Sequence, residues 1–148
     1  MANSSARSFS SHPSRLHTKE QWEQYDGTPV LRRTDPRTLR AAMWAWRTVR
    51  AVARDLPRDG VATVVAPPPA LPAGARRGVH AVLRRRSPTC LERCLVDQAW
   101  LAAQGVPCEV VVGVARTSFD VTAHAWLDIE GHSAVAGGYR EIHRLGPR

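Results

Sequence analysis

The sequence predicts an α+β fold in which helices come first and a small antiparallel sheet follows. Apolar residues recur every three or four positions between Asp35 and Gln104, which is the spacing of helices with one buried face. After Gly105 the pattern changes to a run of valines and then to strict alternation, which is typical of strands. The chain has 148 residues, 43% of them hydrophobic, so it fits one domain with one core.

The N-terminal segment 1–15 is rich in serine and has no apolar period, so we expect it to be a disordered tail. Residues 16–148 would then form the single domain. A short helix is predicted from His17 to Tyr25, because Trp22 and Tyr25 fall on one face.

A longer helix should start at Asp35-Pro36, with aspartate as the N-cap and proline in the first turn, and should end at about Leu56. Its apolar positions predict the face that covers the core: Leu39, Met43, Trp46, Val49, Val52, Ala53 and Leu56. The proline-rich residues 61–74 predict a stiff, extended connection.

Two more helices should follow this connection. The first runs from about Ala75 to Arg86, with Val79, Val82 and Leu83 facing inward. The second should start at Ser87-Pro88, with serine as the cap, and end at Gln104 before Gly105. This start would place Cys90 in the first turn of the helix.

The last third of the chain predicts three strands in an antiparallel meander. Residues 106–115 form a buried valine-rich strand, and residues 121–129 alternate so that His124 points away from the apolar face. After a turn at Glu130-Gly131, Ser133 to Ala136 should form the third strand and lie beside His124.

Cys90 is the strongest candidate for a chemical role. Unpaired amide groups and the positive end of the helix dipole favour a thiolate at a helix start, and the thiolate is the nucleophilic form of cysteine. The alternative is that Cys90 is a small apolar residue that fills the core. Cys94, one turn later, and Cys108, at the start of the valine-rich strand, are expected in the core.

A nucleophilic cysteine needs a base, and His124 is the best candidate because it lies on the open face of a core strand between two alanines. The alternative is a structural imidazole. A zinc site made of the three cysteines and His124 is also conceivable, but the closely paired ligand spacing of zinc motifs is missing.

The residue that would orient the imidazole is harder to assign. Asp128 shares the face of His124, but four residues along a strand span roughly 13 Å, which is too far for a hydrogen bond. Glu141, a water or a backbone carbonyl remains as the alternative. We therefore expect no carboxylate of the third strand to reach the ring.

The motif Cys90-Leu91-Glu92-Arg93 at a helix start, followed by Ala123-His124-Ala125-Trp126, resembles the lasso-peptide leader peptidases of the transglutaminase-like superfamily. The resemblance is close over residues 87–145 and loose in the helices before them. It implies a papain-like cysteine protease core in which Cys90 attacks the bond between leader and core peptide, while His124 acts as base and then as acid.

The same resemblance implies several partners and no metal or redox cofactor. The partners are the precursor peptide, a small leader-binding delivery protein and an ATP-dependent macrolactam cyclase. The family often has an aspartate about twelve residues after the histidine, and this position is Ala136 here. Arg93 matches the arginine of the family motif, either as a support of the fold or as a contact to the precursor.

The composition excludes several classes of function. Three cysteines do not make a disulfide framework, and no apolar run is long enough to span a membrane or to act as a secretory signal, so we expect a cytoplasmic protein. The net charge of +8 comes almost entirely from arginines spread along helices, and we expect no nucleic-acid partner. The alternatives to a leader peptidase are another acyl-transfer enzyme of the superfamily and a non-catalytic interaction module.

Overall fold

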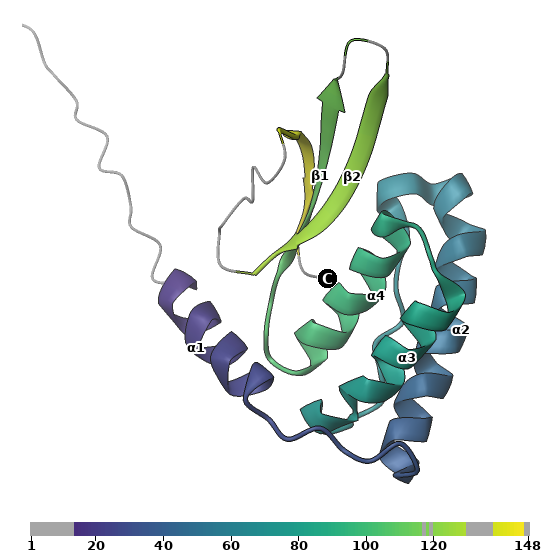
Figure 1. The fold of residues 1–148 in the computed structure, drawn as a ribbon, viewed down its shortest axis with the longest axis vertical. Helices are drawn as coiled ribbons and strands as arrows, with labels where there is room; N and C mark the ends of the chain where they lie inside the picture. Colours follow the sequence, from purple (N-terminus) through teal and green to yellow (C-terminus); the bar gives the residue numbers. More distant parts are fainter. Residues whose placement is uncertain (1–13, 117, 119, 130–137, 147–148) are drawn as a thin grey trace, which may run out of the picture.

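A computed structural model describes residues 14–116, 118, 120–129 and 138–146, and it confirms the α+β class. Helix α4 lies between the sheet on one side and the pair α2 and α3 on the other (Figure 1). The elements are α1 (Ser14–Asp26), α2 (Pro36–Asp59), α3 (Arg76–Arg86), α4 (Cys90–Ala103), β1 (Glu109–Arg116), β2 (Val121–Asp128) and β3 (Arg140–Leu145). Two single turns of 3₁₀-helix, Gly60–Ala62 and Ala73–Ala75, flank the proline-rich connection.

Helix α1 begins at Ser14, three residues earlier than predicted and inside the segment predicted to be disordered; residues 1–13 lie outside the described residues. Tyr25 is buried, as its position on the apolar face predicts, and its hydroxyl accepts a hydrogen bond from Trp100 Nε1 at 3.0 Å. This bond fastens α1 to α4. No described helix is long and apolar enough to cross a membrane.

Helix α2 starts as predicted, because the Asp35 side chain accepts a hydrogen bond from the Arg37 amide and Pro36 is its first residue. It continues past Pro57, which lies in its last turn, and ends at Asp59, with Gly60 as its C-cap. The predicted end at Leu56 is therefore three residues too early.

The prediction of the buried face of α2 is partly wrong. Leu39, Met43 and Trp46 are exposed, whereas the helix turns smaller residues to the core, together with Trp44: Thr38, Ala41, Ala45, Thr48, Val49 and Val52. The reason lies in α3, where Gly78 lets the two helices approach closely. A Cβ atom at Gly78 would collide with the Thr38 carbonyl oxygen.

The described strands have the order β2-β1-β3, with both pairings antiparallel, which is not the order of a meander built from these three. Strand β3 pairs with β1 on its far side rather than with β2. Val110 and Val111, on opposite faces of β1, are both fully buried. Val110 belongs to the core cluster, whereas Val111 is paired with Trp126 and Arg144 in the sheet register. The predicted strand from Ser133 to Ala136 lies outside the described residues.

The buried amide of Gln98 in α4 joins the helical layer to the sheet. Its Nε2 donates to the carbonyl oxygens of Cys108 (2.9 Å), Leu145 (3.1 Å) and Gly146 (3.1 Å). The first carbonyl precedes β1, and the other two lie at the end of β3. One side chain thus holds α4 against both strands.

We predict that Gly78→Ala lowers the free energy of unfolding by about 2 kcal/mol, because the added methyl group forces α2 and α3 apart. Helix propensity alone would favour alanine by about 1 kcal/mol, so it predicts the opposite sign. Urea unfolding measures the difference. Gly146→Ala is the control, since a Cβ atom there meets nothing within 4 Å; equal stability of the two variants would contradict the close packing.

Candidate active site

Cys90 is the first residue of α4, and the chain before it explains why. Ser87 has a left-handed backbone (φ 45°), and its amide donates to the Leu83 carbonyl, so it ends α3. Thr89 is the cap of α4. The Glu92 amide donates to Thr89 Oγ1 at 3.3 Å, and the Thr89 amide donates to Glu92 Oε2 at 2.8 Å.

This reciprocal pair is a capping box, and it corrects the prediction that Ser87 is the cap and Pro88 the first helical residue. The motif Thr89-x-x-Glu92 satisfies two backbone amides at once, which a serine followed by proline does not. The placement of Cys90 in the first turn is nevertheless as predicted. The free backbone amides of the first turn lie at the end of α4 that carries Cys90.

The three thiols have different environments. Cys90 is half-buried and packs against the edge of the core, whereas Cys94 and Cys108 are buried. Burial raises the pKa of both Cys94 and Cys108 to about 12, and the nearby Asp97 carboxylate adds to the effect. The two buried thiols are thus held in the protonated form, as their assignment to the core implies. All three cysteines are free.

Arg93 lies at the joint between α3 and α4. Its Nη2 donates to the Leu83 carbonyl at 3.5 Å, near the end of α3. Burial, together with the positive charges of Arg76, Arg84 and Arg93, lowers the pKa of His80 on α3. In this structure Arg93 therefore supports the fold at the helix joint.

His124 lies in β2 and is exposed. Ala125, the next residue, belongs to the core, so His124 points to the opposite face of the sheet, as the alternation predicts. Its ring lies 6.2 Å from the Trp126 ring and 5.4 Å from the Tyr139 ring, measured between centroids. Gly113, opposite His124 on β1, makes room for the indole, since a Cβ atom there would be 2.7 Å from Trp126 Cη2.

The sequence pattern does not predict that Tyr139 lies beside His124. The signal that could have found it is an aromatic residue directly after Gly137-Gly138, where the chain turns toward the last strand. The pairing of β3 with β1, which the local pattern does not contain, is what brings this segment to the sheet.

The structure does not bring Cys90 and His124 into hydrogen-bond contact. No bond between the two side chains exists among the described residues, which include both. Cys90 packs against the core that α4 shares with the inner face of the sheet, and His124 belongs to the outer face.

Neither candidate for the third residue bonds to His124. Asp128 is buried, and its Oδ2 accepts from Arg144 Nη1 at 2.7 Å. Glu141 pairs with the same guanidinium at 2.8 Å, which lowers the pKa of the Glu141 carboxyl. In the sheet register Glu141 stands two strands away from His124, with Gly113 between them, at roughly 10 Å.

Arg144 also binds Glu109, at 2.6 Å, so one guanidinium serves three carboxylates. Its hydrogen bonds to Glu141, Asp128 and Glu109 raise its pKa above the ordinary value. Asp128 is thus a partner of Arg144, in agreement with the expectation that it does not orient His124. Ala136, where the resembling family has an aspartate, lies outside the described residues.

The zinc alternative finds no geometric support in the described part of the chain. Within it, no three histidine, cysteine or acidic side chains gather closely enough to hold a metal ion.

Comparison with known proteins gives one match. The family model of the transglutaminase-like superfamily matches residues 30–146, which include α2, all the later helices and the three strands. Neither the curated proteins nor the solved structures contain a match.

We predict that iodoacetamide modifies Cys90 of the folded protein at pH 8 at least about 100-fold faster than Cys94 or Cys108. A thiol with a pKa near 12 is a thiolate to about one part in ten thousand at this pH, and burial also blocks access. Peptide mapping by mass spectrometry gives the three rates. The unfolded protein in guanidinium is the control, in which all three should react alike; equal rates in the folded protein would contradict the environments described above.

Proposed function

Because the chain belongs to the transglutaminase-like superfamily, we propose that it is a cysteine-dependent acyl-transfer enzyme with Cys90 as its nucleophile. The observation that carries the proposal is the place of Cys90, the half-buried first residue of a capped helix. The protonated, buried Cys94 and Cys108 make poor nucleophiles. Cys90 is therefore the thiol best suited to the reaction.

The proposed reaction has two steps. The Cys90 thiolate attacks a carbonyl carbon, and the amides at the start of α4 stabilise the oxyanion of the tetrahedral intermediate. The C–N bond then breaks, the leaving amine takes a proton, and a thioester remains on Sγ. Water attacks this thioester and releases the acid, so no metal or redox cofactor takes part.

We propose that His124 takes the proton of the Cys90 thiol and gives it to the leaving amine. This role requires a different position of His124 relative to Cys90. In the described conformation the imidazole lies against Trp126 and Tyr139 on the outer face of β2. The role therefore requires His124 and Cys90 to approach one another when the substrate binds. Among the described strands, β2 is bonded only to β1, and the His124 side chain is exposed.

The proposed substrate is a lasso-peptide precursor, from which the enzyme removes the leader peptide in the cytoplasm. This assignment rests on the Cys-Leu-Glu-Arg and Ala-His-Ala-Trp motifs. The same resemblance implies two partner proteins, a small leader-binding delivery protein and an ATP-dependent macrolactam cyclase. Another substrate of the superfamily's acyl-transfer chemistry, in transamidation or amide hydrolysis, would use the same Cys90.

A second candidate is a non-catalytic interaction module. The observation in its favour is that His124 bonds to neither Cys90 nor a carboxylate among the described residues. In such a protein the two residues would be remnants of a site, and His124 would be a structural member of the aromatic cluster with Trp126 and Tyr139.

We predict that Cys90→Ala lowers leader removal by at least about 1000-fold, because the reaction loses its nucleophile. Cys94→Ala and Cys108→Ala are the matched controls, and each should keep activity once it is corrected for the folded fraction. Cleavage of the precursor, in the presence of the delivery protein, is followed by mass spectrometry. Full activity of Cys90→Ala would refute the nucleophile, and inactivity of the wild type would favour the interaction module.

The role of His124 is tested by a separate experiment, the alkylation of Cys90. The rate of Cys90 alkylation against pH should change its profile in His124→Ala if the imidazole activates the thiol, because the thiolate then loses its partner. His143→Ala, on the far strand β3, is the control. An unchanged profile in His124→Ala would leave His124 structural.

A further inference from the structure

The outer face of α2 carries three large apolar side chains that no other described part of the chain covers. Leu39 is 58% exposed, Met43 50% and Trp46 43%. Their spacing of four and three residues puts them in one line along the helix, which we call the α2 stripe. Seven residues span roughly 10 Å of helix, so the stripe is long enough to hold a short peptide segment.

Arginines border the stripe on the side of the proline-rich connection. Arg40 and Arg47 are seven residues apart and therefore lie on one side of the helix. With Met43 and the prolines Pro67, Pro68 and Pro69, they line a hollow of about 430 Å³. Neither arginine makes an ion pair within the described part of the chain.

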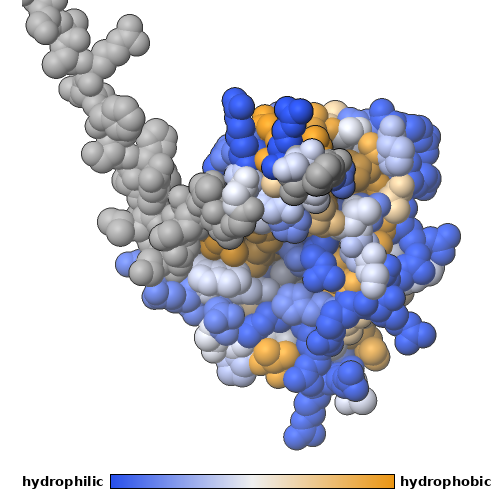
Figure 2. Space-filling view, turned by 45° about the horizontal axis from the view of Figure 1, so that its top comes forward, coloured by the Kyte–Doolittle hydropathy of each residue, from blue (hydrophilic) through white to orange (hydrophobic). Residues whose placement is uncertain are grey.

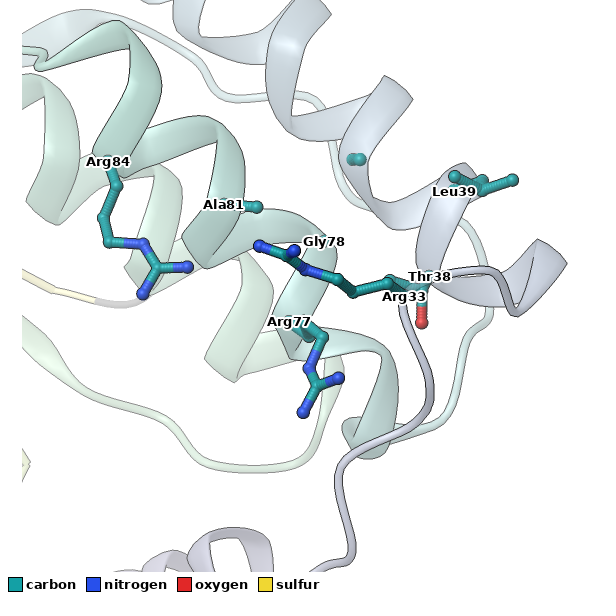
Figure 3. Close-up of a pocket in the computed structure, with 8 residues that line it drawn as sticks. Arg33, Thr38, Leu39, Arg77, Gly78, Ala81 and Arg84 are labelled. Carbon is teal, nitrogen blue, oxygen red and sulfur yellow. The ribbon is translucent and has the colours of Figure 1, made fainter.

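Arginines also border the stripe on the side of α3. Arg33, Arg77 and Arg84 line a second hollow, of about 530 Å³, together with Leu39 and Ala42. In Figure 3, Arg33 extends from the segment before α2 toward α3, whose own Arg77 and Arg84 stand along the same hollow. These three guanidinium groups have no carboxylate partner among the described residues either.

The guanidinium groups are the donors that this hollow offers to a ligand. Thr38 also lines it, but the Thr38 hydroxyl is buried. The three guanidinium groups suit a carboxylate. The charge of the region is one-sided, since α2 has no acidic residue between Asp35 and Asp55.

From this arrangement we propose that the α2 stripe and its two arginine borders bind an acidic peptide segment of a partner protein. The apolar side chains of the segment would cover Leu39, Met43 and Trp46, and its carboxylates would meet the arginines on both sides. The inference goes beyond the proposed function, because it holds whichever acyl-transfer reaction Cys90 performs.

Charge excludes two other occupants. A second copy of the chain would bring its own arginine-bordered stripe against this one, with like charges facing each other. The N-terminal residues 1–13 contain no acidic residue, so they offer the arginines no partner.

The apolar stripe argues against a nucleic acid. A phosphate backbone on the arginines would leave Leu39 and Met43 against charged oxygens. Single strands bind through bases that stack on aromatic rings. The one ring of the stripe, Trp46, already has the Arg50 guanidinium 4.8 Å from its centre. Figure 2 shows one face of the whole molecule, on which apolar patches in orange lie among hydrophilic residues in blue.

An unbiased selection tests the proposal. A random library of 16-residue peptides displayed on mRNA is selected against the whole protein at physiological salt, and the enriched peptides are measured by fluorescence anisotropy. We expect the enriched peptides to be acidic with two or three apolar residues. Met43→Glu should weaken their binding at least about tenfold, because it places a like charge in the middle of the site.

Ile142→Glu is the matched control, since Ile142 is 58% exposed, lies on β3 and receives the same change of charge; it should alter binding less than about twofold. Arg40→Gln with Arg47→Gln should reduce both the affinity and its dependence on salt. The proposal is overturned if no peptide is enriched, if the enriched peptides are not acidic, or if Met43→Glu binds them like the wild type. Tighter binding of a 20-nucleotide single strand than of the best peptide would also overturn it.

Discussion

The hydrogen bonds of the Gln98 amide hold the two layers of this fold together. One NH₂ group on α4 shares its two hydrogens among three carbonyl oxygens, that of Cys108 before β1 and those of Leu145 and Gly146 at the end of β3. Cys108 and Leu145 are buried, and leaving a buried carbonyl unpaired costs about 1–3 kcal/mol. The direction of α4 relative to the sheet depends on this link, and so does the position of Cys90 at its far end.

Helix α4 is thus both a core element and the carrier of the candidate nucleophile. Its middle is packed against buried residues, and the same burial raises the pKa of Cys94, one turn from Cys90, to about 12. Its first turn is different because Ser87 ends α3 and the Thr89–Glu92 box starts a new helix at the surface. Two cysteines on one helix therefore differ in chemistry because of where the helix begins.

Much of this could be predicted from local sequence. Asp35-Pro36 marks the start of α2, and the alternation in β2 predicts that His124 faces away from the core, since both depend on neighbours in the chain. The buried face of α2 could not be read from α2 itself, because the close approach that favours its alanines and threonines depends on Gly78 in α3. The strand order could not be predicted from local sequence either, because β3 pairs with β1 although more than twenty residues separate them in the chain.

Irreversible trapping of the protein shows directly whether Cys90 is the nucleophile. The whole protein is treated with a set of acetylated tripeptide acyloxymethyl ketones that differ in the residue next to the ketone, and the modified residue is mapped by mass spectrometry. We expect one adduct, a thioether on Cys90, formed at a rate that depends on the residue next to the ketone. Modification of Cys94 or Cys108 instead, or a rate on Cys90 that is the same for every tripeptide, would contradict it.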